Sequence, residues 1–104
     1  MIPPRSGSRK PDLKEQQDAA TALAISALSF IASEPERLGR FLALTGIGPE
    51  AIRAAARQPG FLLGVLEHLT SDEALLIEFA NENDVDPEHV AIAREVLAGA
   101  PDND

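Results

Sequence analysis

The sequence predicts an all-α fold, a compact bundle of five to six helices with two similar helix-turn-helix units around a central apolar helix. Apolar side chains recur at helical spacing, and proline and glycine fall where helices begin and end. The composition points the same way, since 44% of the 104 residues are hydrophobic but only four are Phe and none is Trp or Tyr. Such a core is built from Leu, Ile, Val and Ala, which suit helix bundles.

The first two helices follow from apolar periodicity and from helix-capping residues. The first is expected over residues 12–32, and its apolar stripe is wide enough to be covered on two sides. We expect core packing there, with self-association through this helix as the alternative. Ser33 is predicted to cap the second helix, Pro35 lies in its first turn, and Gly46 supplies the left-handed residue that ends it.

The third helix is predicted from Pro49 to about residue 57, and the fourth from residue 59 or 60 to 69. The fourth is apolar nearly all round and is therefore predicted to be the central helix. Gly39 and Gly64 lie inside helices at a cost in stability, so each is expected to permit the close approach of another helix.

The last two helices are marked by their first residues. Ser71 or Asp72 is expected to cap the fifth, and the sixth begins at Pro87 and closes at Gly99. Segment 33–58 aligns with segment 71–96, which pairs Pro49 with Pro87 and predicts two similar helical hairpins. Duplication and convergence on one capping solution both explain this repeat.

Length and charge limit the rest of the prediction. The length suits a single helical domain over residues 12–99, preceded by a flexible basic tail (1–11) and followed by a flexible acidic tail (100–104). The net charge is −8, with one basic and eleven acidic groups in residues 61–104, so nucleic acid is disfavoured as a partner. The absence of Cys excludes disulfides and thiol chemistry. The longest apolar run is too short to cross a bilayer, and we expect a soluble, cytoplasmic protein.

One turn nevertheless invites a phosphate-binding interpretation. Gly46, Ile47 and Gly48 resemble the helix-hairpin-helix motif of DNA-repair and replication proteins, in which such a turn presents backbone N–H groups to a DNA phosphate. Helix capping explains the same residues, and the matching turn of the repeat replaces both glycines with Asp84 and Asp86. We therefore expect a structural turn and keep weak, non-specific DNA binding as the alternative.

No catalytic or cofactor-binding constellation stands out. Neither His68 nor His89 has the spacing of a metal site or the context of a catalytic triad, so no catalytic residue, cofactor or metal is expected. We expect a non-enzymatic module that binds an unknown protein partner, as a monomer or a weak homodimer. The candidate interaction surface consists of the arginines of the second and third helices: Arg37, Arg40, Arg53 and Arg57.

The segments SEPERLGRFLALTG (33–46) and QPGFL (58–62) resemble domain of unknown function 3572, a family of small all-α alphaproteobacterial proteins of uncharacterised function. The resemblance covers most of residues 15–99 and implies a compact α-helical bacterial protein. It brings no activity, cofactor or catalytic residue, and function stays open.

Overall fold

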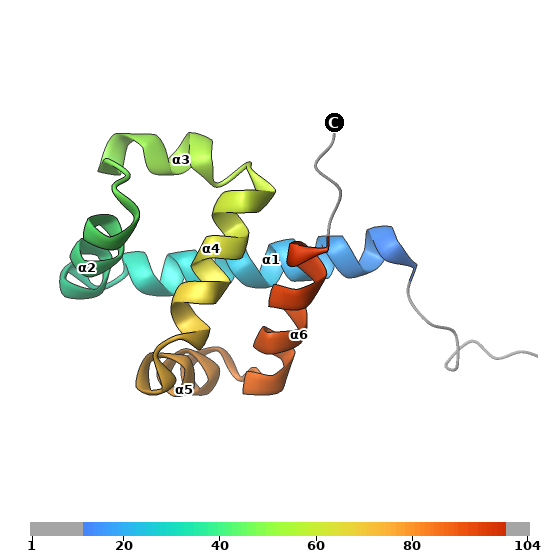
Figure 1. Ribbon diagram of the computed structural model, residues 1–104. Coiled ribbons are helices and arrows are strands. Elements are labelled where there is room, and N and C mark those ends of the chain that lie inside the picture. The colour runs from blue at the N-terminus through green and yellow to red at the C-terminus, as the bar shows by residue number, and fades with distance from the viewer. Residues whose placement is uncertain (1–11, 100–104) are drawn as a thin grey trace, which may run out of the picture.

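The computed structural model describes residues 12–99, which form helices and contain no β-strand (Figure 1). In chain order the helices are α1 (Leu13–Ala32), α2 (Pro35–Thr45), α3 (Ile52–Ala55), α4 (Pro59–Thr70), α5 (Glu73–Asn83) and α6 (Pro87–Ala98). A 3₁₀ turn (Pro49–Ala51) precedes α3. The predicted all-α bundle is thus confirmed. The predicted tails, residues 1–11 and 100–104, lie outside the described residues.

Helix α4 organises the bundle, as predicted. It runs through the middle of the fold, crosses α1, and contacts α1, α5 and α6 (Figure 1). Its buried side chains are Leu62, Val65, Leu66 and Leu69. Across from it, α1 contributes the small buried side chains Ala20, Ala24 and Ala27. Because alanine adds little bulk, α4 and α6 can both pack closely on α1. None of the helices within residues 12–99 has the length and apolar content needed to cross a lipid bilayer.

The junction between α1 and α2 corrects one predicted cap. The Asp12 carboxylate accepts the Glu15 N–H at 2.8 Å and starts α1 in a capping box, as the sequence pattern indicates. Ser33, predicted to cap α2, instead ends α1, and its hydroxyl donates to the Phe30 carbonyl at 2.7 Å. The residue that precedes α2 is Glu34, whose side chain makes no capping hydrogen bond. The prediction for Ser33 was wrong because its backbone is still helical and its hydroxyl serves the preceding turn.

The two predicted helical hairpins share the geometry of their turns. Gly46 ends α2 with φ +75°, and the aligned Asp84 ends α5 with φ +55°, so both occupy the left-handed region. Pro49 and Pro87 then both take the first position of the following helical segment. The similarity thus extends to a backbone conformation that only Gly adopts without strain.

After these turns the two units diverge. The predicted third helix reduces to a 3₁₀ turn and the short α3, whereas α6 has 12 residues. Asp86 caps α6 by accepting the Glu88 N–H at 2.9 Å, but Gly48 has no side chain to do the same for the first unit. Helix α3 also has no buried residue, whereas α6 buries Val90 and two others. Without a cap or a packed face, the third helix is short.

The two helical glycines do not serve the close helix approach that was predicted for them. A Cβ atom built at Gly39 or Gly64 would meet no heavy atom within 4 Å. The prediction was wrong because both positions face open space. We therefore expect Gly39→Ala to raise the free energy of unfolding by about 0.5–1 kcal/mol, the usual gain when Ala replaces Gly inside a helix. Urea denaturation measures this change.

Gly46 provides the matched control for that substitution. A Cβ at Gly46 also meets nothing within 4 Å, but the backbone has φ +75°. Gly46→Ala is therefore expected to lower the free energy of unfolding by about 1 kcal/mol through backbone strain alone. If Gly39→Ala destabilised the protein as well, a close contact of α2 at Gly39 would have to exist.

Candidate functional site

Arg37, the first residue of the predicted arginine surface, points into the bundle. Its side chain is only 17% exposed, and its Nη1 donates to the Phe30 carbonyl at 2.9 Å. The guanidinium carbon lies 4.0 Å from the centre of the Phe30 ring, and Nη2 lies 3.8 Å from the Glu34 carboxylate. Arg37 therefore joins the start of α2 to the end of α1, a structural role that the sequence did not reveal.

Arg40 lies on the same helix but remains exposed to solvent. Its Nη1 lies 3.5 Å from a carboxylate oxygen of Asp72, in a pair whose side chains are 69% and 38% exposed. Asp72 also caps α5 by accepting the Leu75 N–H at 3.2 Å, which confirms one of the two predicted caps. Arg40 thus links α2 to the first turn of α5, and such an exposed pair contributes about 0–1 kcal/mol.

The other two arginines, Arg53 in α3 and Arg57 in the turn after it, are exposed. Within residues 12–99 neither forms an ion pair, in contrast to Arg37 and Arg40. The predicted interaction surface therefore contains arginines in two different situations. Two hold helices together, and two carry charge that is open to a partner. That these four residues bind a partner stays a prediction.

A hollow of about 310 Å³ lies between α2, α4 and α5 and is lined by Glu36, Arg37, Arg40, His68 and Leu75. The His68 ring packs edge-on against Phe41, with ring centres 5.2 Å apart. Burial lowers the pKa of His68, while the Asp72 carboxylate raises it and the Arg40 guanidinium lowers it. Both arginines of the hollow already have partners beside it, Arg37 with Phe30 and Glu34 and Arg40 with Asp72. We interpret it as a junction between helices.

The Gly46–Gly48 turn has a negative charge of its own. Thr45 Oγ1 accepts the Ile47 N–H at 3.4 Å, so one of the N–H groups at the turn already has a partner. The Glu50 carboxylate folds back over Gly48, where a Cβ atom would lie 2.7 Å from Glu50 Oε2. A phosphate approaching Gly48 would meet this carboxylate, and the short α3 offers only a weak helix dipole. DNA binding at the turn stays a prediction that this geometry does not favour.

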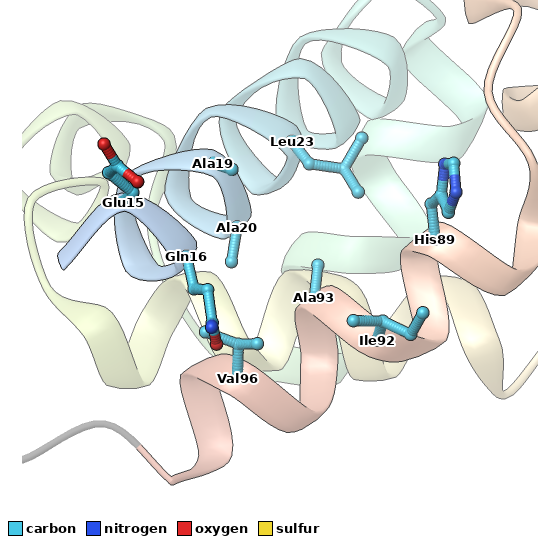
Figure 2. Close-up of a pocket in the computed structure, with 9 residues that line it drawn as sticks. All are labelled: Glu15, Gln16, Ala19, Ala20, Leu23, His89, Ile92, Ala93 and Val96. Carbon is cyan, nitrogen blue, oxygen red and sulfur yellow. The ribbon is translucent and has the colours of Figure 1, made fainter. Parts of the chain in front are cut away.

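A second hollow, which the sequence did not predict, lies between the first half of α1 and α6. This groove has a volume of about 320 Å³ and is lined by Glu15, Gln16, Ala19, Ala20, Leu23, His89, Ile92, Ala93 and Val96 (Figure 2). Gln16 and Val96 lie toward one end of the groove, and Leu23 and His89 lie toward the other (Figure 2). We call this feature the α1–α6 groove.

The surface of the α1–α6 groove is mainly apolar and partly open to solvent. Ala20 and Ala93 are buried beneath it, Leu23 and Val96 are half-buried, and Ile92 is 55% exposed. A neighbouring hollow of about 530 Å³ on α6 shares Ile92 and Val96 and adds Glu88, Ala91 and Glu95. The apolar surface between the two helices therefore continues onto the outer side of α6.

A signal for the groove was present in the sequence. Val90, Ala93 and Leu97 form the buried stripe of α6, and Ile92 and Val96 form a second apolar pair at i and i+4 beside it. On α1, Ala19 and Leu23 have the same spacing beside the buried alanines. Apolar pairs next to a buried stripe indicate that a helix has more apolar surface than its own bundle covers.

Comparison with known proteins identifies a family but no activity. A family model described as "Protein of unknown function (DUF3572)" matches residues 17–100. No curated protein and no solved structure matches the chain. The matched range contains all of α2 to α6 and most of α1, and it includes every residue that lines the groove except Glu15 and Gln16.

Proposed function

The chain belongs to the DUF3572 family of proteins of unknown function, and we propose that it is a non-enzymatic helical protein-interaction module. The α1–α6 groove carries this proposal. Ile92 is 55% exposed and is flanked by the half-buried Leu23 and Val96 in a hollow between two helices. A concave apolar surface that the bundle leaves open is typical of a site for another protein.

In the part of the chain that is described, neither histidine ring is placed beside a hydroxyl or carboxylate group as in a catalytic pair. His68 packs on Phe41, and His89 lies at the rim of the groove. Within residues 12–99 neither imidazole ring is hydrogen-bonded to a hydroxyl or a carboxylate, and no three metal-ligating side chains come together. These observations support a binding role over a catalytic one. The cysteine-free sequence supports our further proposal that the protein acts in a bacterial cytoplasm.

Site-specific photo-crosslinking in the native cell tests whether another protein binds at the α1–α6 groove. A benzophenone side chain at position 92 is expected to crosslink one defined protein, whose purified form then binds the purified module. The same side chain at Ile77 is the control, because Ile77 is 44% exposed but lies on α5, away from the groove. Identical crosslinks from both positions, or none from position 92, would contradict an interaction site at the groove.

The alternative proposal is weak, non-specific DNA binding through Gly46, Ile47 and Gly48. It requires duplex DNA to bind at low salt and to dissociate as salt rises. Gly48→Asp and Arg53→Ala would each have to weaken that binding. No binding at low salt eliminates the alternative.

A further inference from the structure

We propose that the α1–α6 groove binds a basic amphipathic helix of a partner protein, an inference that rests on the proposed function as an interaction module. The apolar floor and the acidic rim of the groove carry it. The partner helix would place apolar side chains against Leu23, Ile92 and Val96. Its Lys and Arg side chains would lie beside the rim glutamates Glu15, Glu88 and Glu95.

Among the described residues, the carboxylates that line the α1–α6 groove and the neighbouring hollow face no lining Lys or Arg. The groove and the neighbouring hollow are lined by three glutamates and no Lys or Arg. Within residues 12–99, Glu88 and Glu95 have no basic partner. Lys14 lies on the opposite side of α1 from Leu23 and pairs with Asp18 at 3.3 Å. Arg94 lies about half a turn away from Ile92 on α6. Electrostatic complementarity therefore selects a basic ligand.

The dimensions of the groove suit a helix. It extends along α1 from Glu15 to Leu23, a length of about 12 Å at 1.5 Å per residue. Apolar anchors at i, i+4 and i+7 of a bound helix span about 10 Å and therefore fit this length. A peptide that binds by adding a β-strand would need an exposed strand edge to pair with, and residues 12–99 contain no strand.

A second copy of the chain is a poorer occupant of this site. A two-fold contact through the groove would bring the acidic rims of both copies together, because an isologous interface uses the same patch twice. The chain also carries a net charge of −8, which adds long-range repulsion between copies. A basic partner would be attracted to the acidic rim at close contact and to the negatively charged chain at longer distance.

Two synthetic helical peptides provide the probes. Both are about 18 residues long, above the length at which isolated helices are marginal. They share one pattern of Leu residues, and the remaining positions are Lys in one and Glu in the other. Fluorescence anisotropy with the full chain is expected to show the Leu/Lys peptide binding at least about tenfold more tightly than the Leu/Glu peptide. Rising ionic strength should weaken that binding.

Paired variants locate the binding. Ile92→Asn is expected to weaken the binding of the Leu/Lys peptide at least about tenfold, whereas Ile77→Asn should leave its affinity unchanged. The double variant Glu88→Gln/Glu95→Gln is expected to weaken the binding of the same peptide about fivefold or more. The control is Glu78→Gln/Glu82→Gln, which removes the same charge from exposed positions on α5. Circular dichroism checks that each variant remains folded.

Each contrary result has its own meaning. Equal weakening by the two double variants would show that diffuse charge attracts the peptide and would overturn the inference. Equal affinity for the Leu/Glu peptide would overturn the requirement for a basic partner. Failure of both peptides to bind would also overturn it, and light scattering would then show whether a second copy occupies the groove. The proposed function as an interaction module is tested separately, by crosslinking from position 92, and that result does not depend on the charge of a peptide.

Discussion

Phe41→Ala is expected to lower the free energy of unfolding by about 3–5 kcal/mol, the usual cost of removing a buried aromatic ring from a core. Phe41 is fully buried and is the only buried residue of α2. Its ring lies edge-on to Phe61 at 5.8 Å and to His68 at 5.2 Å between ring centres. Because Phe41 is the one fully buried side chain of α2, with Leu38 and Leu42 only partly buried beside it, the cavity left by alanine would loosen the helix. Urea denaturation measures the loss, and hydrogen exchange in α2 shows where it occurs.

Two further measurements distinguish loss of the α2 anchor from a general core defect. Phe61→Ala is the control, because Phe61 is only half-buried and its removal should cost less than that of Phe41. In Phe41→Ala, water should reach His68 more easily. Since burial is the main cause that lowers the pKa of His68, this pKa should rise toward its ordinary value, as NMR titration can show. Equal destabilisation by the two Phe variants, with the pKa of His68 unchanged, would contradict the anchoring role.

The helical framework could be predicted because its signals are local. Pro35, Pro59 and Pro87 mark helix starts, and Gly46 marks an end, through conformational restrictions that act on the residue itself. The central place of α4 followed from its apolar content on nearly every side. A local signal predicts less well where one residue can serve either of two neighbouring helices. Ser33 can serve the helix before it or the helix after it, and its position alone does not decide.

The candidate site depends on contacts between segments that are far apart in the sequence. The α1–α6 groove exists because Leu23 of α1 and Ile92 of α6 lie on either side of buried alanines (Figure 2). Sequence periodicity shows that each helix has spare apolar surface, but not that the two surfaces meet. The repeat was misleading in a similar way. Pro49 and Pro87 start their segments alike, but only the second segment gains a capping carboxylate and a buried face.

The role of Arg37 could not be predicted either, because its partners lie in the preceding helix. Arg37→Ala is expected to lower the free energy of unfolding by about 2 kcal/mol. Loss of the charged hydrogen bond to the Phe30 carbonyl contributes most of this, and loss of the contact with the Phe30 ring contributes about 0.5–1 kcal/mol. The carbonyl itself keeps the Ser33 hydroxyl at 2.7 Å, so no buried acceptor is left unpaired, and the loss stays moderate. Thermal and urea denaturation measure the change.

Two arginine variants separate this structural role from the predicted role of Arg37 in partner binding. Arg37→Lys keeps the positive charge but cannot place a flat guanidinium over the ring, so it should recover only part of the lost stability. Arg40→Ala removes an exposed pair with Asp72 and should cost about 0–1 kcal/mol. If Arg37 acted mainly in partner binding, its removal would leave stability unchanged and weaken partner binding as much as Arg53→Ala does. If only the variants at position 37 lose stability, α2 depends on this arginine as well as on Phe41. Arg53 and Arg57 would then be the arginines that are free to meet a partner.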